Sequence, residues 1–147
     1  MKILILNGPN LNLTGRREPE IYGDKTFEDL LGLMKHLFPG VDFVYHQSNI
    51  EGELIDKLHE YGFSAHGIIL NAGAYAHTSV AIGDAVKAIE APVAEVHISN
   101  VFAREEYRHQ SFVSPHARGV LVGFGLYGYI LAADSLIKRS DYKDFTV

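Results

Sequence analysis

The stretch GIILNAGAYAHTSVAIGDAVKAIEAPVAEVHI, residues 67–98, decides the fold. It begins and ends with short apolar runs, at 67–70 and 93–98, which predict two β-strands. Between them, residues 78–90 have the length and the apolar spacing of a helix. A strand, a helix and a second strand in this order form the crossover unit that joins parallel strands of one sheet.

The same alternation extends to both sides of this stretch. Further strands are predicted at KILIL (2–6), VDFVYH (41–46) and GVLVGF (119–124). Further helices are predicted at FEDLLGLMKHLF (27–38), GELIDKLHEYGF (52–63) and YGYILAADSLIKR (127–139). Mostly unbroken apolar strands between helices indicate a parallel sheet that is covered on both faces. We therefore expect an α/β chain with a flavodoxin-like, doubly wound, five-stranded parallel sheet and helices on both faces.

The chain of 147 residues is expected to form one catalytic domain, residues 1–147. A closed eight-stranded βα barrel would need roughly 250 residues. Two long irregular segments, 7–25 and 99–117, are expected to carry function, because long loops in compact domains often do. Residues of about 13–24 are expected to form a lid, and residues of about 126–147 a C-terminal helix and tail.

Two helix starts carry capping signals. Thr26 precedes the helix at 27–38, and Asp29 follows three residues later, which is close to a capping box. Ser48 and Asn49 are candidate caps for the helix at 52–63.

Composition excludes several classes of function. The net charge of −5 argues against nucleic acid as a partner. The absence of cysteine removes disulfides, thiolate metal sites and a cysteine nucleophile, and it suits a reducing cytoplasm. The run Ile3–Leu6 is too short for a signal peptide or a membrane span. The histidines show no spacing typical of a metal site, and the G-x-G-x-x-G match at 123–128 opens the last helix, where close packing explains it better than a dinucleotide.

Polar side chains follow four of the predicted strands, where they end. They are Asn7 and Asn10, Gln47 and Ser48, Asn71, and His97 with Ser99 and Asn100. Ligands of open α/β sheets bind beyond the carboxyl ends of the strands, near the point where the strand order reverses. We therefore expect a binding site for a polar ligand at this edge.

Two pairs of charged residues near the fourth strand have a functional and a structural interpretation. Glu95 and His97 project to one face of a strand, where a carboxylate would fix the tautomer of an imidazole and favour a proton donor, or would simply satisfy a buried histidine. Arg104 and Arg108 would share one face of a short helix and bind an anion, or would pair with Glu105 and Glu106.

The segment GRREPEIYG, residues 15–23, places Arg16 and Arg17 within reach of Tyr22. A guanidinium beside a phenol stabilises the phenolate, and lowering its pKa by two units takes roughly 2.7 kcal/mol. The alternative is a surface loop with a tyrosine at its rim.

Four segments together resemble the type II 3-dehydroquinate dehydratases: NGPNLN (7–12), GRREPEIYG (15–23), LNAGAYAHTSVAIGDA (70–85) and EVHISNVFAREEYRHQS (95–111). The resemblance covers nearly the whole chain to about Lys138. It implies a cofactor-free and metal-free hydro-lyase that converts 3-dehydroquinate to 3-dehydroshikimate by anti elimination through an enolate, in the shikimate pathway or in quinate catabolism. It also implies a homo-oligomer, a dodecamer built as a tetramer of trimers.

The resemblance also implies a role for each matching residue. Tyr22 would remove the C2 proton and Arg17 would lower its pKa, Asn10 would stabilise the enolate through a water, and His97, backed by Glu95, would protonate the leaving hydroxyl. Substrate binding would use Asn71, His77, Ile98, Ser99 and Arg108, with Asp84 reaching in from a neighbouring subunit two helical turns beyond His77. The stretch Ala74–Ala76 departs from the small and hydroxylated residues expected before His77, so Tyr75 is expected to alter the pocket rim or the subunit contacts.

Two alternatives come from other classes. A flavin- or nucleotide-binding module would need a phosphate-binding loop after the first strand, and residues 7–12 carry no Ser/Thr/Gly run of that kind. A receiver-like signalling domain would need acidic residues at the ends of strands one and three, where this chain has Asn7 and Asn71.

Overall fold

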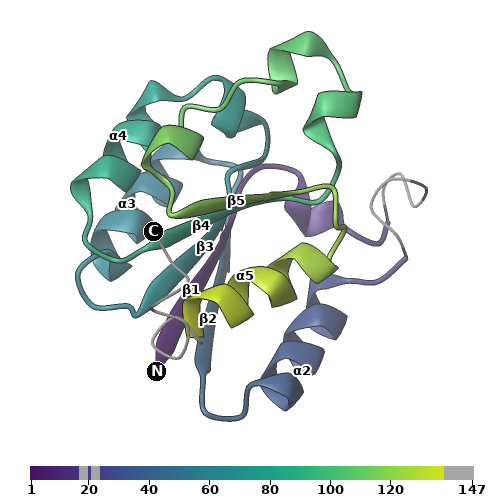
Figure 1. Cartoon of the computed structure of the whole chain (residues 1–147), viewed down its shortest axis with the longest axis vertical. Helices are drawn as coiled ribbons and strands as arrows, with labels where there is room; N and C mark the ends of the chain where they lie inside the picture. Colours follow the sequence, from purple (N-terminus) through teal and green to yellow (C-terminus); the bar gives the residue numbers. More distant parts are fainter. Residues whose placement is uncertain (17–19, 21–23, 138–147) are drawn as a thin grey trace.

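A computed structural model describes residues 1–16, 20 and 24–137 of the chain. Its centre is one sheet of five parallel strands in the order β2-β1-β3-β4-β5 (Figure 1). The strands are β1 (Lys2–Asn7), β2 (Asp42–Gln47), β3 (Gly67–Asn71), β4 (Val93–His97) and β5 (Gly119–Val122). The strand order reverses between β1 and β3, where Asn7 and Asn71 are in register. The predicted five-stranded, doubly wound parallel sheet is confirmed.

Two helices cover each face of the sheet. They are α2 (Phe27–Leu37) and α5 (Tyr127–Ile137) on one face, and α3 (Glu51–Tyr61) and α4 (Val80–Ala88) on the other (Figure 1). Each begins and ends within three residues of its predicted position. Short 3-10 helices lie in the connections: η1 (Leu11–Leu13), η2 (Gly73–His77), η3 (Val101–Ala103), η4 (Glu106–Arg108) and η5 (Ser114–His116).

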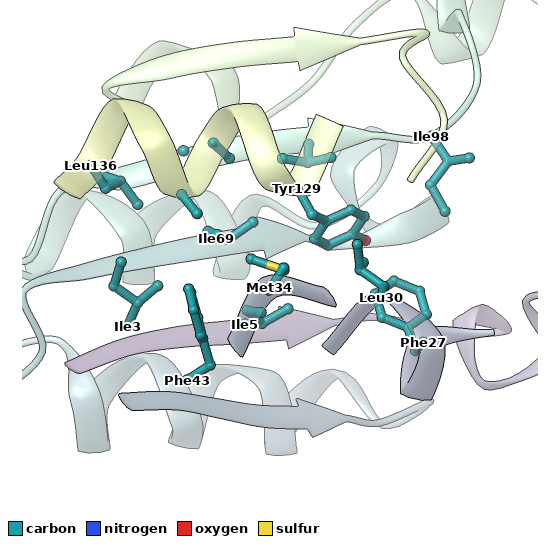
Figure 2. Close-up of a cluster of buried hydrophobic side chains, with 14 of the residues drawn as sticks. Ile3, Ile5, Phe27, Leu30, Met34, Phe43, Ile69, Ile98, Tyr129 and Leu136 are labelled. Carbon is teal, nitrogen blue, oxygen red and sulfur yellow. The ribbon is translucent and has the colours of Figure 1, made fainter. Parts of the chain in front are cut away.

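The alternation of side chains along each strand gives the molecule two cores. Ile3, Ile5 and Ile69 point to the face of α2 and α5, where they meet Met34 and Tyr129 (Figure 2). The residues that alternate with these isoleucines along β1 and β3 point to the opposite face and pack on α3 and α4. They are Leu4, Leu6, Ile68 and Leu70. Because successive side chains of a strand point to opposite faces, an unbroken apolar run can supply both cores at once.

The two capping predictions have different outcomes. Thr26 and Asp29 form the predicted capping box, in which each side chain accepts a hydrogen bond from the backbone N–H of the other residue. The prediction for α3 is wrong, because its N-cap is Ile50, which has no side-chain cap. Ser48 instead accepts from the Ile50 N–H in a turn and donates to Glu53, while Asn49 contacts the first loop of the chain.

In the glycine-rich segment 123–128, the predicted close packing of helix on strand is confirmed for Gly128, while Gly123 and Gly125 serve the turn before α5. Gly123 and Gly125 have φ angles of 85° and 59°, in the left-handed region that favours glycine. A Cβ on Gly128 would lie 3.3 Å from Cγ1 of Val96, so α5 starts close against β4. Along the helices of the described ranges, none is long and apolar enough to cross a membrane.

Substitution of Gly8 tests how closely the ends of β1 and β3 approach each other. Its N–H donates to the Asn71 carbonyl at 2.7 Å, and a Cβ there would lie 2.3 Å from the Ala72 carbonyl oxygen. Gly8→Ala should therefore lower the free energy of unfolding by about 1–3 kcal/mol in urea titrations. Gly32→Ala, at an open position in α2, should raise it by about 0.5–1 kcal/mol. Equal effects at both positions would contradict the close approach.

Candidate active site

A pocket lies at the carboxyl ends of β1, β3 and β4, beside the point where the strand order reverses. Seven of the eleven predicted site residues line it: Asn10, Asn71, His77, His97, Ile98, Ser99 and Arg108. Arg104 lines it too, and Leu11, Leu13 and Val101 contribute apolar surface. The location follows from the parallel sheet, whose strands bring residues far apart in sequence to one edge.

Asn10 stands at the turn after β1. Its φ of 68° is the single positive value among the non-glycine residues of the described chain. Asn49, on the loop after β2, accepts a hydrogen bond from the Asn10 N–H at 3.0 Å and another from the Gln47 side chain at 3.1 Å. The Tyr75 hydroxyl donates to the Asn49 carbonyl at 2.8 Å. Three loops thus hold an unusual backbone conformation, and Asn10 lines the pocket.

Asn71 lies at the end of β3 and is buried. Its amide nitrogen donates to the Tyr129 hydroxyl at 2.8 Å, and its oxygen accepts from the Gly73 N–H at 3.1 Å. The Tyr129 hydroxyl in turn donates to the Asn7 oxygen at 2.8 Å. Burial raises the pKa of Tyr129, so the phenol stays neutral and keeps its proton for Asn7. The Asn71 amide carries a second hydrogen, which is available to a ligand.

Glu95 and His97 form the predicted pair on β4. His97 Nε2 lies 2.8 Å from Glu95 Oε1, and both side chains are buried. Because the carboxylate accepts the Nε2 hydrogen, Nδ1 is the nitrogen left for the pocket that His97 lines. Burial pushes the pKa of Glu95 upward, but hydrogen bonds from His97, Ser111 and Ser114 outweigh it, and the pKa is lowered. Glu95 is therefore an anion at neutral pH.

His77 lies beside His97 but has a different partner. The two rings stack with centroids 5.7 Å apart, and His77 Nδ1 lies 2.7 Å from the Gln110 carbonyl oxygen. A carbonyl only accepts, so Nδ1 carries the hydrogen and Nε2 presents a lone pair. Burial lowers the pKa of His77, and His97 and Arg108 lower it further, against the opposing effect of the Gln110 hydrogen bond. His77 is therefore a neutral acceptor.

The two arginines of the pocket are placed differently from the prediction. Arg108 lies in η4, but Arg104 precedes it in extended backbone, so they share no helix face. A 3-10 turn of three residues is too short to hold both. Arg104 donates to the Ser99 hydroxyl at 3.1 Å, and Arg108 donates to Glu105 at 2.7 Å. The predicted pairing with an adjacent glutamate is thus confirmed for both arginines, because Arg104 Nε also lies 3.9 Å from Glu105 Oε2, and both still line the pocket.

Asp84 lies apart from this group. It is exposed on α4 and does not line the pocket. The expectation that it follows His77 on one helix is wrong, because His77 belongs to η2 and Ser79 caps a new helix by accepting from the Ile82 N–H. Arg17 and Tyr22 lie outside the residues that the structure describes, as does much of the predicted lid at 13–24.

Sequence reasoning missed residues that support the site from behind. Asn49 holds Asn10, Tyr129 holds Asn71, and Ser111 and Ser114 donate to Glu95. Ser111 belongs to a motif quoted above, but its spacing from Glu95 follows no helix or strand period. Nowhere in the ranges that the structure covers, the pocket included, are three His, Asp or Glu side chains grouped as metal ligands would be.

Known proteins of one family match this chain. The family model for class II dehydroquinases covers residues 1–137. A 3-dehydroquinate dehydratase of Exiguobacterium sp. is 56% identical over 140 residues, which are 95% of this chain and 96% of that protein. The crystal structure of a type II dehydroquinase from Butyrivibrio crossotus superposes with a TM-score of 0.88 at 46% identity, covering 92% of this chain and 97% of that one. A second such structure, from Propionibacterium acnes, has a TM-score of 0.86 at 42% identity and covers 92% of this chain and 94% of that one.

The lowered pKa of His77 predicts a dependence of stability on pH. The unfolded chain takes up a proton at this histidine near its ordinary value of about 6.5, before the folded chain does. Stability from this source is therefore complete above about pH 6.5 and is lost as the pH falls toward the folded pKa. His77→Gln should reduce the loss of unfolding free energy between pH 7.5 and 5.5, measured by urea titration. Identical slopes for the variant and the unmodified chain would contradict the assignment.

Proposed function

This chain belongs to the class II dehydroquinase family, and on that premise we propose that it removes water from 3-dehydroquinate to give 3-dehydroshikimate. It is then a hydro-lyase of the shikimate pathway. The observation that carries the proposal is the pocket where His97, backed by Glu95, faces the same space as Asn10, Asn71 and Arg108. The flavin-binding and receiver-like alternatives lose their basis with the family assignment.

The reaction begins with the loss of a proton beside a ketone. Tyr22, as a phenolate maintained by Arg17, takes the proton from C2, and the electron pair of the C–H bond forms an enolate. Asn10, through a water molecule, stabilises the enolate oxygen. This stabilisation matters because charge that develops in a transition state is best met by donors that are already in place. The held conformation of Asn10 supports this role.

The second step expels the hydroxyl group from C1. The enolate collapses to the conjugated enone, the C1–O bond breaks, and the proton on His97 Nδ1 leaves with the oxygen as water. Nε2 is engaged by Glu95, which supports Nδ1 as the donating atom. Base and acid act on separate atoms, and each contributes typically 10²–10⁴-fold to such reactions.

Different residues of the pocket bind the carboxylate and the ring oxygens of the substrate. The Asn71 amide and the backbone N–H groups of Ile98 and Ser99 hold the carboxylate. His77 Nε2 accepts from a ring hydroxyl, as its neutral state requires, and Arg108 binds a second oxygen. Arg108 is kept in place by Glu105 and by the Tyr107 ring, whose centroid lies 5.2 Å from the guanidinium carbon.

We propose that the reaction runs without cofactor or metal, because elimination beside a ketone changes no oxidation state and needs only a base, an acid and an enolate stabiliser. The protein then acts in the cytoplasm, which suits a chain without cysteine.

We propose that the chain assembles into a homo-oligomer, a dodecamer built as a tetramer of trimers. Asp84 supports it, because an exposed residue outside its own pocket can act in the pocket of a neighbouring subunit.

The first test is the activity itself. The purified chain should convert 3-dehydroquinate to the conjugated enone, followed by ultraviolet absorbance, with no addition and equally in the presence of a chelator. Borohydride should have no effect, because the proposed mechanism has no imine to reduce. Inactivation by borohydride only when substrate is present would instead indicate a Schiff-base enzyme, and no absorbance change at all would reject the proposed reaction.

Tyr22 and Arg17 provide a sharper test of the chemistry. Tyr22→Phe keeps the ring and loses the proton acceptor, so it should bind substrate but lose nearly all turnover. Retention of more than about a hundredth of kcat would rule out Tyr22 as the base. Arg17→Gln should move the acidic limb of the kcat/KM profile to higher pH, because it removes the charge that lowers the pKa of the phenol.

Complementation tests the role of Asp84. Asp84→Ala and Tyr22→Phe should each be nearly inactive alone. Mixed subunits should recover activity, because some hybrid pockets then combine an intact Tyr22 with an intact Asp84 from the neighbour. Failure to recover activity, with subunit exchange shown by mass spectrometry, would place the action of Asp84 in its own chain.

A further inference from the structure

Glu95 is held by more than its histidine. Its side chain is 1% exposed, and its two oxygens receive three hydrogen bonds. Oε1 accepts from His97 Nε2 at 2.8 Å and from the Ser111 hydroxyl at 2.6 Å, and Oε2 accepts from the Ser114 hydroxyl. The carboxylate can therefore turn away from His97 only by breaking its bonds to both serines.

Ser111 lies between η4 and η5, and Ser114 is the first residue of η5. The neighbours of the Ser111 hydroxyl fix its orientation. The Ser111 oxygen accepts the N–H groups of Val113 and Ser114 at 3.0 and 3.2 Å. With these two N–H groups at its lone pairs, its own hydrogen is left for Glu95. The adjacent Phe112 N–H donates to the Ala76 carbonyl at 2.9 Å, which fixes this chain against η2.

Building on the proposed function, we propose that Ser111 and Ser114 are positioning residues for the elimination step. They hold Glu95 as an oriented carboxylate, so that His97 presents a protonated Nδ1 to the departing hydroxyl group. They touch neither the substrate nor the reacting atoms, and they act only through Glu95.

Hydroxyl groups suit this role better than cations. A buried carboxylate needs donors, because burial alone disfavours its charge. An arginine or lysine in place of the serines would supply them but would also repel a protonated His97. Neutral hydroxyls stabilise the carboxylate without that repulsion. The lowered pKa of Glu95 agrees with this arrangement, because burial raises it and the hydrogen bonds from His97, Ser111 and Ser114 outweigh burial.

The test compares two rates in one protein sample. Exchange of the C2 hydrogen of 3-dehydroquinate with deuterated solvent reports the base and the enolate, and enone absorbance reports the loss of water. Ser114→Ala should lower the rate of water loss at least about tenfold, the loss expected for a hydrogen bond to a charged group. Exchange at C2 should stay within about threefold of that of the unmodified chain. A merely structural role would instead lower both rates together.

Matched variants complete the experiment. Ser114→Thr keeps the hydroxyl and should restore water loss. Ser135→Ala, whose hydroxyl donates to the Ala132 carbonyl in α5, should leave both rates unchanged. If Ser114→Ala does not fold, the ratio of the two rates is taken from Ser111→Ala. An active unmodified chain with an unchanged ratio in the alanine variant overturns this inference alone. An unmodified chain that forms no enone overturns the proposed function, and the inference with it.

Discussion

The hydrogen bonds that join Asn7, Tyr129 and Asn71 are the constraint on which the site depends. They link the ends of β1 and β3 to α5 in the buried layer beneath the pocket. A buried amide without hydrogen-bond partners costs free energy. Asn7 and Asn71 both reach the Tyr129 hydroxyl only if β1 and β3 end side by side and the first turn of α5 packs over these two strand ends. A shift of one residue in either strand would turn its asparagine to the opposite face of the sheet. The register of the sheet and the position of the pocket are thus set together.

Much of this arrangement could be predicted from sequence because it follows local periodicity. Apolar runs separated by helical patterns predicted the five strands and four α-helices found among the described residues. Parallel strands necessarily bring Asn71 and His97 to one edge. The contact between Glu95 and His97 was predictable for the same reason, since residues two apart on a strand point to one face. Thr26 and Asp29 were predictable because a capping box is complete within four residues.

The remaining contacts have no local period to reveal them. Tyr129 and Asn7 are 122 residues apart, and Asn10 and Asn49 are 39 apart, so each pair forms only when the sheet is assembled. The irregular segment 99–117 misled the helix prediction for Arg104 and Arg108 because its turns are too short to repeat. Asp84 was expected two helical turns beyond His77, although the helix predicted at 78–90 begins after that histidine and Ser79 is a residue type that favours N-caps.

Sheet and irregular chain therefore make different contributions to the pocket. The neighbouring strands β3 and β4 bring the two histidines together, His97 at the end of β4 and His77 in η2, which follows β3. Their rings stack on each other. Their hydrogens lie on different nitrogens because of what stands behind them: the Gln110 carbonyl accepts from Nδ1 of His77, and the Glu95 carboxylate accepts from Nε2 of His97. The carbonyl of Gln110 and the serines that hold the carboxylate come from one short segment, 110–114. A stretch without a regular helix or strand, fixed to η2 by the Phe112 N–H, thus distinguishes two chemically identical side chains.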